Sequence, residues 1–179
     1  MTQIGTTYAQ GLYALAQEES LTDEILSQLD VLEKTVGADQ NYLKLLSTPA
    51  LSKDERRELI DQAFRDKVHI YVLNFMKLLT EKGYIRHFSE CCRAYRQLYN
   101  EEHGILPVRA VSAVAMSQQQ LARLQEKLEQ LTGKRVCIEN VVDHRVLGGV
   151  RLDYDGVRID GTVKNRLDSV RKLLETTVL

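Results

Sequence analysis

The fold is decided by residues 149–160, which read Gly149-Val-Arg-Leu-Asp-Tyr-Asp-Gly-Val-Arg-Ile-Asp160. Asp155-Gly156 is a two-residue turn of the kind that closes β-hairpins, and apolar and charged positions alternate on both sides of it. If this turn sets the register, the apolar side pairs Tyr154 with Val157, Leu152 with Ile159, and Val150 with Gly161. The other side pairs Asp153 with Arg158 and Arg151 with Asp160, each pair worth about 0.2–1 kcal/mol. A one-residue slip would turn the apolar set toward water, so the sequence predicts one register.

The residues that precede and follow this hairpin predict a small mixed α/β domain over residues 105–179. Residues 105–115 alternate and are rich in valine, and residues 134–142 read as a second strand. Between them, a capping box of Ser117 and Gln120 opens a helix whose expected inward positions are Leu121, Leu124, Leu128 and Leu131. Strand–helix–strand implies a right-handed crossover and two parallel or near-parallel strands. A last helix follows, with Val163, Leu167, Val170 and Leu174 at helical spacing.

Residues 1–104 read as six helices with short connections, which predicts an antiparallel helical bundle. A capping box of Ser52 and Glu55 opens the fourth helix, and the fifth, residues 67–82, is apolar over much of its circumference. Such a helix is either buried or presents a second face to a partner. The apolar period changes from helical to alternating at Gly104. The predicted fold class is therefore α+β with two domains: a six-helix bundle in residues 1–104, and a mixed α/β domain with a C-terminal β-hairpin and helix in residues 105–179.

Composition favours a reduced, intracellular globular protein. The chain is 44% hydrophobic and 27% charged, and no apolar run approaches the roughly 20 residues that span a bilayer. Residues 1–19 lack a secretory signal, and three cysteines, two of them adjacent, give no disulfide framework. Residues 1–104 hold 12 Lys/Arg against 16 Asp/Glu, and residues 105–179 hold 12 against 9. Neither half has the basic excess of a nucleic-acid binder, and the asymmetry suggests two surfaces with different partners.

The sequence shows no catalytic, cofactor-binding or metal-binding motif. Gly133-Lys134 lacks the glycine and the Ser/Thr of a phosphate-binding loop, and Gly148-Gly149 precedes a strand where a dinucleotide fingerprint needs a helix. Cys91 and Cys92 point about 100° apart on a helix and cannot share one zinc. Pairing Cys137 with His144 would give a nucleophile and a base, but nothing in the sequence shows that they meet. We therefore expect no catalytic residue, no cofactor and no metal.

The segment Asp160-Gly161-Thr162 has two interpretations. Asp160 is either a functional carboxylate beside a turn, or it completes the charged side of the hairpin while Thr162 caps the last helix. The second interpretation fits the predicted register.

Four segments, in order along the chain, resemble the delta subunit of F-type ATP synthases, the family of the mitochondrial oligomycin-sensitivity-conferring protein. They are Tyr8-Ala-Gln-Gly-Leu-Tyr-Ala-Leu-Ala16, Asn74-Phe-Met-Lys-Leu-Leu79 followed by Lys82-Gly-Tyr84, Val108-Arg-Ala-Val-Ser-Ala113, and Asp143-His-Arg-Val-Leu-Gly-Gly149 continued by Ile159-Asp-Gly-Thr-Val163. The chain departs from the usual residues of the family at Gly11, Tyr84 and Thr162. These substitutions keep size or capping chemistry.

The resemblance implies a non-catalytic subunit of the peripheral stalk, or stator. Such a subunit links the catalytic head to the membrane sector and resists torque while ATP synthesis is coupled to proton or sodium transport. The resemblance also implies that the N-terminal domain binds the alpha subunits of the head and the C-terminal domain binds the b-type stalk subunits. We expect a peripheral protein at the cytoplasmic face of the cell membrane, or the equivalent face of a thylakoid membrane, without direct membrane insertion or nucleic acid.

For the head, we expect an amphipathic partner helix in a groove between the first and fifth helices, because Ala9 and Gly11 allow close approach. The candidate contacts are Tyr8, Gly11, Leu12, Leu15, Phe75, Met76 and Leu79; the alternative is that most of these are core residues. A structural signature, expected to shape the C-terminal domain rather than touch a partner, comprises Asp143, Gly148, Gly149, Asp160, Gly161 and Thr162. A soluble helical adaptor unrelated to energy coupling would show the same features and is the alternative function.

Overall fold

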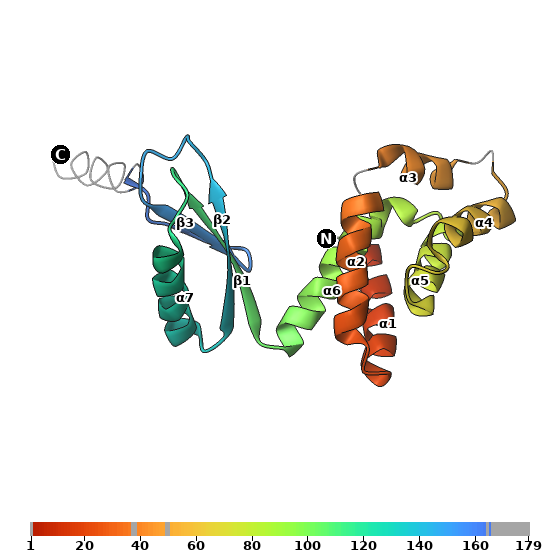
Figure 1. The fold of residues 1–179 in the computed structure, drawn as a ribbon, viewed down its shortest axis with the longest axis horizontal. Coiled ribbons are helices and arrows are strands. Elements are labelled where there is room, and N and C mark those ends of the chain that lie inside the picture. Colours follow the sequence, from red (N-terminus) through yellow and green to blue (C-terminus); the bar gives the residue numbers. More distant parts are fainter. Residues whose placement is uncertain (1, 37–38, 49–50, 164, 166–179) are drawn as a thin grey trace, which may run out of the picture. The chain divides into compact units, whose positions relative to one another are not determined.

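The computed structural model describes residues 2–36, 39–48, 51–163 and 165 (Figure 1). These residues contain seven α-helices, one 3-10 helix and a four-stranded sheet with parallel and antiparallel neighbours. The expected combination of helices with a mixed sheet is therefore confirmed. The chain divides into two compact units, residues 1–99 and residues 100–179, each with a core of its own.

The first unit is helical. Its elements are α1 (Gln3–Glu18), α2 (Thr22–Val36), α3 (Gln40–Ser47), α4 (Lys53–Phe64), α5 (Ile70–Glu81), the 3-10 helix η1 (Ile85–His87) and α6 (Phe88–Glu102), whose last residues pass into the second unit. The antiparallel arrangement of these six α-helices as one bundle stays a prediction.

Side chains at the helix starts explain where the helices begin. The predicted capping box of α4 is confirmed: Ser52 N donates to Glu55 Oε2 at 2.7 Å, and Glu55 N donates to Ser52 Oγ at 3.2 Å. The fifth helix begins three residues later than predicted, because the His69 imidazole caps it by accepting from Tyr71 N at 3.3 Å. The predicted sixth helix opens instead as the short 3-10 turn η1 before α6 begins at Phe88.

One apolar core holds the first unit together. Its largest fully buried side chains include Tyr95 and Phe88 of α6 and Ile25 and Leu29 of α2. The Tyr95 ring packs edge-on against Tyr13 of α1, with centroids 5.0 Å apart. This core fixes which helix faces remain on the surface.

The second unit contains β1 (Ile105–Ser112), α7 (Gln118–Thr132), β2 (Arg135–Val142), β3 (Val150–Tyr154) and β4 (Val157–Asp160). The strand order is β2-β1-β3-β4, with β1 parallel to β2 and the other neighbours antiparallel. The predicted parallel pair of strands joined through a helix and the predicted hairpin are therefore both confirmed, while the handedness of the crossover stays a prediction. Ser117 and Gln120 form the predicted capping box of α7. Ser117 N donates to Gln120 Oε1 at 2.9 Å, and Gln120 N donates to Ser117 Oγ at 3.3 Å.

The register of the hairpin is the predicted one. β3 and β4 pair Arg151 with Asp160, Leu152 with Ile159, Asp153 with Arg158, and Tyr154 with Val157. Asp155 and Gly156 both have positive φ, +45° and +75°, as a type I′ hairpin turn requires.

The apolar face of the sheet is covered only in part. Leu106, Val108, Leu128 and Val136 form its core, and Leu152 and Tyr154 pack against them. Val157 and Ile159, expected inward, are 49% and 48% exposed, because β4 is an edge strand and α7 packs on β2, at the opposite edge. The inward position predicted for Leu131 is also wrong, since this side chain near the end of α7 is 82% exposed. The predicted last helix, residues 163–174, lies largely outside the described residues.

Candidate functional site

The structure separates the residues predicted for the groove into core and surface. Leu12, Phe75, Met76 and Leu79 are between 0% and 6% exposed and belong to the core of the first unit. Gly11 and Leu15 are exposed, the latter by 48%, and Tyr8 is half-buried. Four of the seven candidates therefore fit the alternative, that they are core residues.

The accessible apolar residues of α1 lie on one face. Ile4, Tyr8, Gly11 and Leu15 follow one another at spacings of four, three and four residues, which places them on one side of a helix. We call these four residues the α1 stripe. No atom lies within 4 Å of a Cβ built on Gly11, so this part of the stripe is open. Because Gly11 has no side chain, a second helix can approach the backbone of α1 closely at this stripe.

Sequence reasoning missed the accessible face of α5. Ile70, Asn74 and Leu78 lie one turn apart, and the two apolar side chains are 53% and 41% exposed. The only sequence signal was the excess of apolar residues around this helix. The hollow next to this face has a volume of about 490 Å³ and is lined from α4 and α5 by Arg57, Asn74, Lys77, Leu78 and Glu81.

Two ion pairs hold α4 against α5 beside that hollow. Arg57 Nε lies 2.6 Å from Glu81 Oε1, and Lys77 Nζ lies 2.6 Å from Asp61 Oδ1. The hydrogen bond from Arg57 holds the pKa of the Glu81 carboxyl below its usual range. These charges border the exposed face of α5 and give it a polar rim, an arrangement common at protein–protein interfaces.

Five of the six signature residues lie together where the hairpin ends. A Cβ on Gly149, whose φ is +82°, would lie 2.6 Å from Gly161 O and 2.9 Å from Thr162 Cα. Only glycine therefore allows the two segments to approach this closely. Gly161 N donates to Val150 O at 3.1 Å, and Val163 N donates to Gly148 O at 3.0 Å. Hydrogen bonds from the Thr162 side chain and from Thr162 N, the latter to Asp160 Oδ1 at 2.9 Å, hold the pKa of the Asp160 carboxyl low.

Asp143 lies in a different turn. Its carboxylate accepts from Arg145 N and Nε, both at 3.0 Å. These bonds hold the Asp143 pKa low and close the turn after β2. Thr162 Oγ1 accepts from Asn165 N at 3.4 Å, the kind of bond expected at the start of a helix. The contacts described for the signature residues therefore close turns within the second unit, and their role in shaping this domain stays a prediction.

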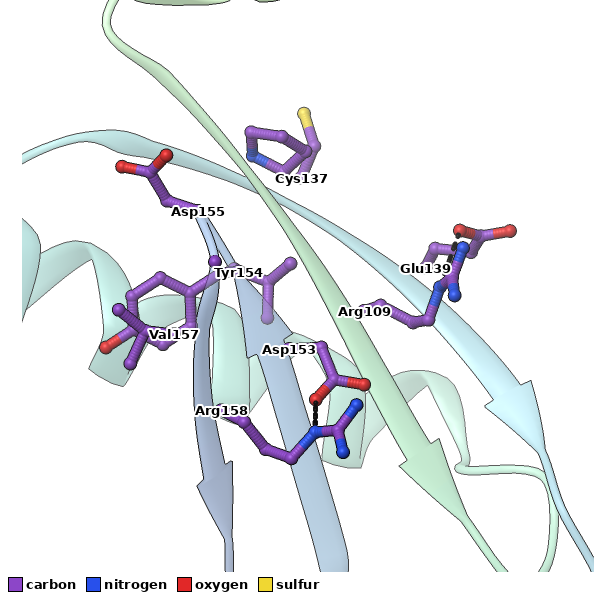
Figure 2. Close-up of a pocket in the computed structure, with 11 residues that line it drawn as sticks. Arg109, Cys137, Glu139, Asp153, Tyr154, Asp155, Val157 and Arg158 are labelled. Atoms are coloured by element: carbon purple, nitrogen blue, oxygen red, sulfur yellow. Dashed lines mark hydrogen bonds and ion pairs between the residues drawn. The ribbon is translucent and has the colours of Figure 1, made fainter. Parts of the chain in front are cut away.

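The sheet face made by alternate residues opposite the core carries a row of charges, here called the charge row: Glu139 on β2, Arg109 on β1, Asp153 on β3 and Arg158 on β4. Arg158 Nε donates to Asp153 Oδ1 at 2.8 Å, and Arg109 Nε lies 3.9 Å from Glu139 Oε2 (Figure 2). The bond from Arg158 lowers the pKa of the Asp153 carboxyl. The row crosses all four strands with alternating sign.

The predicted ion pair between Arg151 and Asp160 is not the contact that the structure shows. Arg151 Nε donates to Asp153 Oδ2 at 3.3 Å, while Asp160 accepts from Thr162. Arg151 therefore forms its hydrogen bond with Asp153 on its own strand and not with the cross-strand partner Asp160.

The residues considered for chemistry in the sequence are not brought together in the described part of the chain. Cys137 lies near the start of β2 and His144 follows its end, and the stretch from Cys137 to Val142 alone extends about 16 Å along the strand. A nucleophile–base pair of these two residues is therefore excluded. Cys91 and Cys92 are buried, and burial raises the pKa of the Cys91 thiol to about 11. Within the described part of the chain, no group of three or more metal-ligating side chains is placed to hold an ion, and no helix could cross a membrane.

Comparison with known proteins identifies the family of the chain. Residues 4–174 match the family described as ATP synthase delta (OSCP) subunit. ATP synthase subunit delta of Clostridioides difficile is 34% identical over 98% of this chain and 97% of its own length. The corresponding protein of Alkaliphilus oremlandii is 30% identical over 96% and 95%.

A chain of the Toxoplasma gondii mitochondrial ATP synthase hexamer shares the fold, with a TM-score of 0.76 at 15% identity over 97% of this chain and 98% of that one. The family match covers nearly all of the sequence. The chain therefore belongs to the ATP synthase delta (OSCP) subunit family, the non-catalytic peripheral-stalk subunit of F-type ATP synthases.

Proposed function

We propose that the two units of this stator subunit bind different partner subunits of the synthase. In this proposal residues 1–104 act as a six-helix bundle that binds the alpha subunits of the catalytic head, and residues 105–179 bind the b-type stalk subunits. The protein is then held at the cytoplasmic face of the membrane by its partners. The opposite charge balance of the two halves and their separate cores support two docking modules.

The α1 stripe is the observation that carries the first half of this proposal. An apolar stripe on one side of a helix, left uncovered by its own core, is the usual docking face for an amphipathic partner helix. Leu15 is 48% exposed, and Gly11 leaves room for close approach. We therefore revise the candidate contacts of the groove: Tyr8, Gly11 and Leu15 stay, Ile4, Ile70 and Leu78 join them, and the buried candidates Leu12, Phe75, Met76 and Leu79 are assigned to the core.

The test is a titration of the full chain with a synthetic peptide of the N-terminal segment of the alpha subunit from the same organism, followed by NMR. We expect chemical-shift changes along the α1 stripe and the exposed face of α5. Leu15→Asp and Leu78→Asp should each weaken binding at least about tenfold. Val31→Asp is the matched control, since this apolar side chain of α2 is 62% exposed but lies on neither helix. A peptide that binds without perturbing α1 and α5 would refute the proposed groove.

A second experiment tests the assembly as a whole. The full chain should co-purify with the ATPase head and with the b-type subunits. Head binding should survive deletion of residues 105–179, whereas binding of the b-type subunits should be lost. Retention of the b-type subunits by residues 1–104 alone would contradict the assignment of partners to units. The unrelated-adaptor alternative is set aside by the family match.

A further inference from the structure

A glutamate of α6 holds the N-terminal turn of α1. Thr2 N donates to Glu90 Oε2 at 3.2 Å, and the Thr2 hydroxyl donates to the same oxygen. The other oxygen, Oε1, lies 3.4 Å from His87 Nδ1. The Thr2 Oγ1 also accepts from Gly5 N at 3.4 Å and so caps α1. Both carboxylate oxygens of Glu90 are therefore used, one toward α1 and one toward η1.

Backbone contact fixes the separation of the two helices at the same point. A Cβ on Gly5 would lie 3.2 Å from Glu90 Cβ and 3.4 Å from the Glu90 carbonyl carbon. Gly5 is buried, so α1 rests directly on α6 at this residue. Any larger side chain at position 5 would push the N-terminal half of α1 outward.

Aromatic contacts extend this support to the α1 stripe. The Tyr8 ring packs edge-on against Tyr84, with centroids 5.9 Å apart, and Tyr84 packs against His87 at 6.4 Å. His87 in turn contacts Glu90. A chain of contacts therefore runs from Thr2 through Glu90, His87 and Tyr84 to Tyr8. Ile4 lies on α1 between Thr2 and Tyr8, the two residues where this chain of contacts meets the helix.

We propose that Glu90 is a positioning residue for partner recognition: it holds the first turns of α1 so that Ile4 and Tyr8 present their side chains to the partner helix. Glu90 itself lies on α6, outside the α1 stripe. This inference rests on the proposed function, since it assumes that the α1 stripe binds the head. The pairing joins residues 88 positions apart, so no local sequence pattern predicts it.

Hydrogen exchange of the free, full-length protein tests whether Glu90 stabilises the first turns of α1. In Glu90→Ala, amides of residues 3–8 should exchange roughly tenfold faster, because a charge-assisted bond to the helix start is lost. Amides of α2 and α5 should keep their protection. Glu90→Gln should retain most of the wild-type protection of residues 3–8, because the glutamine amide oxygen still accepts from Thr2. Glu58→Ala, an exposed glutamate of α4 bonded to Gln62 of the same helix, is the matched control.

The same variants are then titrated with the alpha-subunit peptide used above. We expect Glu90→Ala and Gly5→Ala to weaken binding roughly fivefold, mainly through faster dissociation, and Glu58→Ala to bind as the wild type does. Thr2→Val removes the hydroxyl bond to Glu90 together with the cap on Gly5 N, without altering the core, and should weaken binding at least as much as Glu90→Ala.

Three results would overturn the inference. The first is unchanged exchange at residues 3–8 in Glu90→Ala. The second is faster exchange throughout the first unit, which would show a role in overall stability alone. The third is wild-type peptide affinity in Glu90→Ala and Thr2→Val. Failure of the wild-type protein itself to bind the peptide would refute the proposed groove and, with it, the positioning role.

Discussion

Replacing Gly149 with alanine should destabilise the second unit for two reasons. The backbone conformation at this position disfavours alanine, and the new side chain would clash with a neighbouring segment. The new Cβ would lie 2.6 Å from Gly161 O and 2.9 Å from Thr162 Cα, both backbone atoms. Neither atom can move without the chain around it. The substitution therefore has to push apart the two segments that close the hairpin.

The magnitude follows from two contributions. An alanine at a left-handed φ costs about 1–2 kcal/mol. Separating the segments would also break the bonds Gly161 N to Val150 O and Val163 N to Gly148 O, each worth about 1 kcal/mol. We therefore expect Gly149→Ala to lower the free energy of unfolding of the second unit by about 3–4 kcal/mol.

Gly156→Ala is the matched control, because Gly156 has a similar φ of +75° and nothing lies within 4 Å of its built Cβ. It should cost only the conformational part, about 1–2 kcal/mol. Hydrogen exchange read by mass spectrometry on peptides from β3 and β4 reports the second unit separately from the first. Equal losses of protection in the two variants would refute the close approach of residues 149 and 161.

The three cysteines should differ in reactivity, since burial raises the pKa values of Cys91 and Cys92 while Cys137 is exposed. Ellman's reagent should modify one thiol rapidly in the native chain, and a fast second thiol would contradict the packing of α6. Ser52→Ala should cost about 1 kcal/mol in urea unfolding, because half of a capping box is lost, and an unchanged midpoint would argue against the cap. The Ser52 N–H lowers the pKa of Glu55, so this carboxylate stabilises fully above its unfolded pKa of about 4.3 and progressively less as the pH falls through the lowered value. The stability difference between wild type and Glu55→Gln should therefore shrink toward low pH, and a difference independent of pH would refute the assignment.

The parts of the fold that depend on neighbours in sequence could be predicted. The hairpin register follows from the Asp155-Gly156 turn and the alternation around it, and the capping boxes at Ser52 and Ser117 follow from residues three positions apart. The parallel pairing of β1 and β2 follows from the helix between them. Each of these rules acts over a few residues or a single connection.

The partner surface could be predicted only in outline. α5 is apolar on most sides, so its sequence period does not say which side faces the core, and Phe75, Met76 and Leu79 proved buried while Ile70 and Leu78 did not. The neighbouring helices decide this, and their packing is not written in the sequence of α5. Contacts between distant residues, such as Thr2 with Glu90, leave no local signal at all.

The charged side of the hairpin, made by Arg151, Asp153, Arg158 and Asp160, disfavours strand slips that the apolar pattern alone would tolerate. Moving β4 by two residues keeps every apolar side chain on its own side of the sheet, because side chains alternate with a period of two. In one direction such a move would bring Arg158 opposite Arg151, and in the other it would bring Asp160 opposite Asp153. Like charges directly opposite each other repel. The charged side of the hairpin therefore favours a single length of the β3–β4 pair among the registers that its apolar side accepts equally well.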